Sequence, residues 1–200
     1  MTLSKQELRR EQILHAALEV VVQYGYEKSR MDDVVQKAHL SKGAIYWYYK
    51  SKKELYLDLV RYWVNRYSVV LNHIVEEEAP AAEQLQGVFT YFIDQFEKDP
   101  TVFKALVEFW SMAGKDLEFK SKLQKIYSSF LELIERIIAK GVTSGEFKAV
   151  DTKTTALSIM VNIEGINWFT LFEIPGVRAR EYIQTITAFI LAGLTKTDKK

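Results

Sequence analysis

The chain has 200 residues, a formal net charge of +1 and no cysteine, with 48% hydrophobic and 26% charged residues. A chain of this length can bury a substantial core, and this ordinary globular composition argues against a disordered or a disulfide-stapled protein. No apolar run reaches the roughly 18 residues that span a bilayer, and the polar N-terminus lacks the apolar segment of a secretion signal, so we expect a cytoplasmic protein.

Apolar residues recur at helical spacing almost throughout, which predicts an all-α fold of about nine helices. The segment Ser4-Lys5-Gln6-Glu7 fits a capping box for a first helix, which ends at Gly25. A cap pattern that begins at Ser29 opens a short second helix. Ser41 caps an equally short third segment that runs to about Tyr48.

Longer helices follow. The segment Ser51-Lys52-Lys53-Glu54 is a clear capping box, and one apolar stripe continues behind it to Ile74. Further helices are predicted around Leu85 to Phe96, from Asp99-Pro100 to Gly114, from Asp116 to about Lys140 with Gly141 as terminator, at about 151–172, and at 178–194.

The charge is distributed unevenly along the chain. Residues 1–53 hold ten Lys and Arg against six Asp and Glu, whereas the remainder carries a net negative charge. A basic first quarter on an acidic body favours a polyanionic partner for the first part alone, although solvated helix faces carry similar runs.

The segment from Ser29 to Tyr48 is typical of a helix-turn-helix. A turn of about Ala38 to Ser41 has the length of that motif's sharp corner. The small residues Gly43 and Ala44 then let the start of the third helix approach DNA closely, with backbone N–H groups free to face phosphate.

The N-terminal region resembles the TetR family of bacterial transcriptional regulators over roughly residues 8–55. The matching positions are Ile13, Ala16-Ala17, Gly25-Tyr26, Ser29, Asp33-Val34, Leu40 to Tyr46, and Tyr49 to Leu55. Two positions depart from the family pattern: His39 stands where glycine is usual in the turn, and Tyr49 replaces a phenylalanine. Histidine visits positive φ more often than most residues, so we expect mild strain at His39, while the added hydroxyl of Tyr49 needs water or a partner.

The resemblance implies roles for particular residues on DNA. Phosphate contacts fall to Ser29, Tyr46 and Lys52, and to Lys42 unless Lys42 reaches guanine instead. Gly43, Ala44 and Trp47 would face the major groove. The predicted DNA-binding set is Ser29, Arg30, Ser41, Lys42, Gly43, Ala44, Tyr46, Trp47 and Lys52. Alternatives stay open, since Tyr46 and Tyr49 could be core aromatics and Arg30 could pair with Asp33 or Glu27.

Most aromatic residues lie beyond residue 60, where they either pack a helical core or line a small-molecule site. The resemblance favours a site that encloses an inducer. The predicted ligand-binding set is Trp63, Tyr67, Phe89, Phe92, Phe96, Phe103, Glu108, Phe109, Trp110, Tyr127, Phe130, Asn162 and Trp168. Among the polar residues that interrupt these apolar stretches, Glu108 or Glu164 would favour a cationic or hydrogen-bonding aromatic ligand if it faces the cavity. Either glutamate could instead face outward or lie in an interface.

The last two helices carry apolar residues on more than one face, which indicates a homodimer formed through them. We predict a DNA-binding domain over residues 1–50 and a ligand-binding and dimerisation domain over 51–200. The function that follows is a repressor released from a palindromic double-stranded operator by a small lipophilic or aromatic inducer. An activator of the same fold, and an all-helical enzyme or carrier of a lipophilic molecule, are the alternatives.

No catalytic arrangement is recognisable in the chain. The histidines His15, His39 and His73 are too scattered for a metal site, and the sequence has no phosphate-binding glycine loop or nucleophile motif. We therefore expect neither an enzyme nor a bound metal or cofactor, and no membrane partner.

Overall fold

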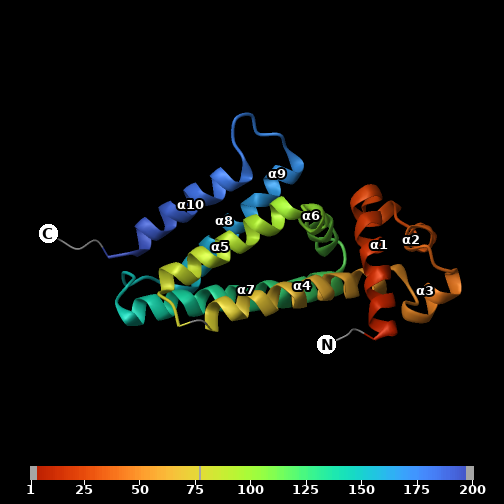
Figure 1. Ribbon diagram of the computed structural model, residues 1–200, viewed down its shortest axis with the longest axis horizontal. Helices are drawn as coiled ribbons and strands as arrows, with labels where there is room; N and C mark the ends of the chain where they lie inside the picture. Colours follow the sequence, from red (N-terminus) through yellow and green to blue (C-terminus); the bar gives the residue numbers. More distant parts are fainter. Residues whose placement is uncertain (1–3, 77, 197–200) are drawn as a thin grey trace. The chain divides into compact units, whose positions relative to one another are not determined.

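The structure, a computed structural model, describes residues 4–76 and 78–196 (Figure 1). Its elements are α1 (Lys5–Lys28), α2 (Met31–Ala38), α3 (Lys42–Tyr48), α4 (Lys52–Glu76), α5 (Ala81–Lys98), α6 (Thr101–Ala113), α7 (Leu117–Ser144), α8 (Thr152–Glu164), the 3₁₀ turn η1 (Gly165–Asn167), α9 (Trp168–Leu171) and α10 (Ala179–Leu194). The all-α prediction is confirmed. Within these ranges, no helix is both long and apolar enough to cross a bilayer.

The chain forms two compact units. Unit 1 holds the described residues up to Asn65 together with Thr101–Gln124, and unit 2 holds Arg66–Pro100 and the described residues from Lys125 onward. The long helices α4 and α7 each contribute one part to either unit. The predicted boundary at residue 50 separates a DNA-binding from a ligand-binding domain, which is a division by function and not by compact unit. It stays a prediction.

Unit 1 is built around α1, which packs against α2 and α6. The α1 face that does so is a continuous apolar stripe in which Ile13, Leu14, Ala17 and Val21 are fully buried. Residues spaced three and four apart fall on one side of a helix, so this stripe buries several large side chains in one direction. Burial stabilises a fold by about 25 cal/mol per Å² of apolar surface, so this stripe holds α1 firmly against α2 and α6.

Unit 2 is organised by α5 and α10, which contact each other, and by α8, which contacts α10. Arg180 of α10 reaches Asp94 at 2.6 Å and Glu97 at 2.5 Å on α5. On the same two helices, Phe89 and Ile183 are buried. Since exposed ion pairs add little stability, the apolar contacts hold the two helices together.

The helix starts match the predicted capping in part. At Ser4 both bonds of the capping box form, because the Glu7 N–H donates to Ser4 Oγ and the Ser4 N–H donates to the Glu7 carboxylate. At Ser51 the Glu54 N–H donates to the serine, but the Glu54 carboxylate accepts from the Lys50 N–H. The cap predicted at Ser29 is wrong: Arg30 is the N-cap of α2, and the Ser29 hydroxyl donates to a carbonyl behind it.

Two predicted helix limits are also corrected. Gly141 does not end α7, which continues to Ser144. It allows close packing instead, because a Cβ there would lie 2.2 Å from the Phe147 ring. The helix predicted over 151–172 is broken at η1, where Tyr182 lies against Gly165 and its hydroxyl donates to the Asn162 carbonyl at 3.0 Å.

Candidate functional site

The turn between α2 and α3 has the sharp corner that a helix-turn-helix needs. His39 ends α2 in the left-handed region with φ 54° and ψ 41°, which confirms the positive φ predicted for it. Ser41 caps α3 as predicted, since its hydroxyl accepts the Ala44 N–H at 3.2 Å. From α1, Gln12 Nε2 donates to the Ala38 carbonyl at 2.7 Å and so secures the end of α2.

One face of α3 is open to solvent. Lys42 and Gly43 in its first turn and Trp47 one turn later are all exposed, Trp47 to 63%, while Ile45 on the opposite side is fully buried. A Cβ on Gly43 would meet no atom within 4 Å. Tyr46 is half-buried beside this face. The helix is therefore anchored by one apolar side chain and presents a lysine, a small residue and a large aromatic ring outward.

Charged groups flank this face. Lys42 Nζ lies 2.7 Å from Asp32 Oδ1 in an exposed ion pair, which DNA phosphates could replace at little cost. Arg30 is exposed at the start of α2. Of the partners predicted for Arg30, Asp33 does approach it, but the Asp33 carboxylate accepts the backbone N–H of Arg30 at 2.7 Å.

Two predicted phosphate ligands are engaged inside unit 1. The buried Ser29 hydroxyl donates to the Tyr26 carbonyl at 2.8 Å. Lys52 Nζ donates to the carbonyls of Tyr26 at 2.6 Å and Ser29 at 3.0 Å, and burial lowers the pKa of its ammonium. For either side chain to bind phosphate, these bonds must be exchanged, and both roles stay predictions.

The turn that Lys52 holds, Gly25–Ser29, is called the elbow here. Gly25 interrupts α1 with φ 72° and ψ 162°. Glu108 Oε2 of α6 accepts the Tyr26 N–H at 3.2 Å. The elbow is thus bound by α4 through its carbonyls and by α6 through its N–H. Glu108, predicted to contact ligand, has this structural partner in unit 1.

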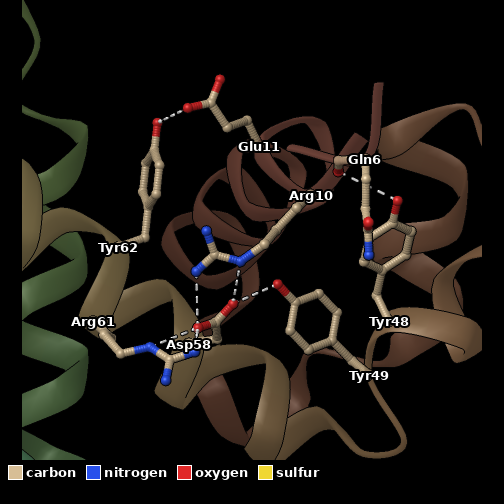
Figure 2. A network of polar contacts seen from close by, with 8 residues as sticks. All are labelled: Gln6, Arg10, Glu11, Tyr48, Tyr49, Asp58, Arg61 and Tyr62. Atoms are coloured by element: carbon tan, nitrogen blue, oxygen red, sulfur yellow. Dashed lines mark hydrogen bonds and ion pairs between the residues drawn. The ribbon is translucent and has the colours of Figure 1, made fainter. Parts of the chain in front are cut away.

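A buried carboxylate organises the other end of the three-helix region (Figure 2). Asp58 of α4, 7% exposed, receives Arg10 Nε at 2.8 Å and Arg10 Nη2 at 2.9 Å from α1. The Tyr49 hydroxyl, just after α3, donates to it at 2.6 Å, and Arg61 also donates. Burial alone would raise the pKa of Asp58, but these hydrogen bonds outweigh burial and hold the pKa below its usual range.

This network joins the C-terminal end of α3 to α1 and α4. Sequence reasoning did not identify Asp58 as a site residue. The available signal was Tyr49, whose hydroxyl needed a partner where the family usually has phenylalanine. Asp58 is that partner, nine residues further along the chain.

The predicted ligand-binding residues are divided between the two units. Unit 1 contains Trp63, Phe103, Glu108, Phe109 and Trp110, and unit 2 contains Tyr67, Phe89, Phe92, Phe96, Tyr127, Phe130, Asn162 and Trp168. In unit 1, the buried Phe109 ring stacks on Phe119 at 6.3 Å between centroids, which is a core contact. The ligand roles of these residues stay predictions.

Unit 2 contains a chain of edge-to-face aromatic contacts. Tyr67 lies 6.0 Å from Tyr91 and 6.2 Å from Phe92, and Phe92 lies 5.3 Å from Phe130, between ring centroids. Apolar walls of this kind are usual in small-molecule sites. A set of predicted residues from α4, α5 and α7 is therefore brought together here.

A half-buried carboxyl group is joined to a tyrosine of α7. Glu164, the last residue of α8, accepts a hydrogen bond from the Tyr127 side chain of α7. Burial raises the pKa of Glu164 to about 7, and the Tyr127 hydrogen bond opposes the rise only in part. Within the described ranges, no group of His, Asp and Glu residues is arranged to hold a metal ion.

Two predicted ligand residues lie at the surface. Trp168 is 59% exposed, and the Asn162 amide donates to the Ser158 carbonyl at 2.8 Å within α8. Trp168 belongs to a larger group of exposed apolar side chains on α8, α9, α10 and the segment between α9 and α10. This apolar surface comprises Leu157, Val161, Trp168, Leu171, Phe172, Ile174, Val177 and Phe189.

Two family models together match residues 13–195. One, described as bacterial regulatory proteins of the tetR family, matches residues 13–59. A second, described as the C-terminal part of BetI-type transcriptional repressors, matches residues 54–195. The two together include both α2–α3 and the aromatic contacts of unit 2.

Individual proteins give the same result. The fatty acid metabolism regulator protein of Bacillus subtilis is 27% identical over 137 residues, 68% of this chain and 70% of that protein. The crystal structure of Bacillus subtilis FadR in complex with stearoyl-CoA has a TM-score of 0.80 at 22% identity, over 92% of this chain and 98% of that one. A Saccharomonospora viridis protein in complex with choline has a TM-score of 0.82 at 19% identity, over 94% and 98%.

The Asp58 network generates a prediction about stability. Asp58→Asn keeps the volume but turns an NH₂ group toward the arginine and tyrosine donors, so we expect a loss of about 2 kcal/mol in the free energy of unfolding. Tyr49→Phe removes one neutral donor, and about 1 kcal/mol is expected. Urea unfolding at pH 7 measures both. The exposed Asp94→Asn is the matched control, with little change expected.

The pH dependence of that loss follows from the lowered pKa of Asp58. Its stabilising contribution is present above the unfolded-state pKa and is lost as pH falls through the lower folded-state pKa. The gap between wild type and Asp58→Asn should therefore stay constant near neutrality and close only below about pH 3.9. A gap that already closes between pH 7 and pH 5 would contradict the charge-pairing account.

Glu164 generates a prediction of the opposite sign. Because its folded-state pKa is about 7, the folded state retains a proton that the unfolded chain has already lost, and stability falls as pH rises from about 4.3 to about 7. Glu164→Gln cannot ionise, so its thermal midpoint relative to wild type should be higher at pH 8 than at pH 5. The exposed Glu132→Gln on α7 should show no such trend. An equal difference at both pH values would refute the raised pKa.

Proposed function

This chain belongs to the TetR family of bacterial regulatory proteins, and from that membership we propose that it is a repressor that leaves a palindromic operator when it binds a small lipophilic molecule. The observation that carries the proposal is the exposed face of α3. A seven-residue helix with a buried isoleucine behind it and a lysine, a glycine and a tryptophan in front has the form of a recognition helix.

On DNA, the N-terminal half of α3 would lie in the major groove. The missing side chain of Gly43 lets the backbone approach the duplex, and Ala44 and Trp47 are the candidates for apolar contacts to base edges. Lys42 and Tyr46 would bind phosphates or, for Lys42, guanine. The Asp58 network supports this role because it fixes the C-terminal end of α3 on α1 and α4.

The proposal includes a homodimer formed through the apolar surface of unit 2. Eight exposed large apolar side chains on consecutive elements are more than isolated surface residues, and such patches commonly mark protein interfaces. A two-fold axis there would present two recognition helices to successive major grooves, about 34–36 Å apart. A palindromic operator follows from that symmetry.

The ligand response rests on the family's solved complexes and on the aromatic contacts of unit 2. Two structural relatives hold stearoyl-CoA or choline. In this chain, a ligand bound among those rings would favour the conformation whose recognition helices do not fit successive grooves. The shift in DNA affinity can be no larger than the ligand's own preference between the two conformations.

The DNA-binding proposal is tested by selection from a pool of genomic duplex fragments at moderate salt, followed by sequencing. We expect one palindrome to be enriched, and Trp47→Ala or Lys42→Ala to weaken its binding by about tenfold or more, the value of one good contact. The Lys42 variant should also reduce the salt dependence by about one counterion. The position of the palindrome relative to the promoter then separates a repressor from an activator.

The matched control is Lys104→Ala, which removes an exposed lysine on α6. Trp47 and Lys42 are exposed, so their removal leaves the core of unit 1 intact. Salt-sensitive binding without a preferred sequence, in wild type and variants alike, would refute recognition by α3.

The dimer is tested by sedimentation of a variant of the apolar surface. Phe189 is 69% exposed on α10, and Phe189→Asp would place a charge in the proposed interface. We expect the wild type to sediment as a dimer and this variant as a monomer at micromolar concentration, because a desolvated unpaired charge is costly. Gln184→Asp, on another face of α10, should remain dimeric. A variant that sediments like wild type would exclude this face.

A further inference from the structure

The turn that joins α8 to η1 carries a buried acceptor that lacks a donor. Asn167 is 4% exposed, and its Nδ2 donates to the Glu164 carbonyl at 2.8 Å. A carbonyl only accepts hydrogen bonds, so this contact fixes the amide orientation and leaves Asn167 Oδ1 as the other group. Among the described residues, that buried oxygen has no hydrogen-bond partner. A buried amide oxygen left unpaired costs about 1–3 kcal/mol.

Glu164 brings a second acceptor to the same turn. Side chains three residues apart eclipse each other in a 3₁₀ turn, so Glu164 and Asn167 lie on one side of it. The Tyr127 side chain gives the Glu164 carboxylate one hydrogen bond. In the described part of the chain, no ion pair joins Glu164 to a lysine, arginine or histidine. A carboxylate partly withdrawn from water normally has such a partner, and the described residues supply none for Glu164.

Aromatic rings extend from this turn. Tyr127 and Phe130 are three residues apart on α7 and so share a face of that helix. Phe130 contacts Phe92, and Phe92 contacts Tyr67. The bond between Tyr127 and Glu164 therefore links the turn to the face of α7 that carries Phe130, and aromatic faces attract cations in addition to packing against hydrocarbon.

We propose that unit 2 recognises a lipophilic organic cation that carries at least one N–H, such as a protonated amine or an amidinium. Glu164 pairs with the charge, Asn167 Oδ1 accepts an N–H, and the rings of Phe130, Phe92 and Tyr67 cover the apolar body. A carboxylate without a cationic partner and an amide oxygen without a donor match a cation that carries an N–H, and they mismatch an anion. This inference rests on the ligand-binding role proposed above and names the chemical class of that ligand.

The test measures four probes of equal chain length against the full-length wild-type protein by titration calorimetry at pH 8. The probes are decylamine, decan-1-ol, decyltrimethylammonium and decanoate, each below its micellar concentration. Decylamine is expected to bind at least tenfold tighter than decanol, and tighter than the trimethylammonium probe, which has no N–H for Asn167. Decanoate is expected to bind weakest, because its charge repels Glu164.

The glutamate is then tested by substitution. Glu164→Gln should reduce the preference for decylamine over decanol by about tenfold, whereas the exposed Glu132→Gln should leave it unchanged. Thermal melts confirm that the variants are folded. If Glu164→Gln does not fold, the four probes on the wild-type protein still decide, because their order depends on charge and N–H donors alone.

Three results would overturn the inference: decanol or decanoate binding as tightly as decylamine, a preference unchanged in folded Glu164→Gln, or tight binding of stearoyl-CoA with none of decylamine. Operator binding without ligand is measured in parallel. If the protein binds an operator but does not prefer the amine, only the proposed ligand class is refuted. If it binds the amine but no operator sequence, the proposed function as a transcriptional regulator is refuted.

Discussion

The arrangement of unit 1 depends on a single buried carboxylate. Asp58 accepts hydrogen bonds from Arg10 of α1, from Tyr49 at the end of α3 and from Arg61 one turn further along α4. Recognition of a base edge tolerates little displacement, and α3, a helix of seven residues, buries only Ile45. Apolar burial of one side chain cannot fix the direction of so short a helix. The charged network supplies the missing constraint, and its several bonds to one desolvated group make it directional where hydrophobic contact is not.

The elbow gives unit 1 a second fixed point with a different character. Its carbonyls bind Lys52 of α4, and its Tyr26 N–H binds Glu108 of α6. Both helices reach the same five-residue turn, so a shift of either one changes the position of the start of α2. At the Asp58 end, the hydrogen bonds among the described residues come from α1, from α4 and from Tyr49, which follows α3. A conformational change that reached unit 1 through α6 would therefore act at the elbow and leave the support of α3 intact. Such a division would let α3 move as a rigid piece.

Local patterns were sufficient to predict most of the fold, because helix periodicity and capping are properties of neighbouring residues. The helix-turn-helix, the left-handed His39 and the caps at Ser4 and Ser41 all follow from residues a few positions apart. Contacts between distant segments account for what was missed. In the sequence, Gly141 indicates a helix end, but in the structure it gives room to the Phe147 ring. Ser29 indicates an N-cap, but its hydroxyl donates to the Tyr26 carbonyl. Lys52 indicates a phosphate ligand, but its ammonium donates to carbonyls of the elbow. The pattern of hydrophobic and polar residues cannot show which distant group a glycine or a lysine will contact.

Because contacts between distant segments cannot be predicted from local pattern, aromatic residues are poor guides to ligand chemistry, and unpaired polar atoms in the structure are better ones. A ring such as Phe109 is satisfied equally by a core neighbour or by a ligand, so its presence distinguishes neither. A buried acceptor is satisfied only by a donor. Glu108 and Glu164 looked alike in sequence, each beside aromatic residues, but Glu108 has the Tyr26 N–H, while the turn that bears Glu164 retains an unpaired Asn167 oxygen as well. The difference between them is therefore the unpaired Asn167 oxygen in the turn of Glu164, and that buried acceptor is what an N–H of a cationic ligand would fill.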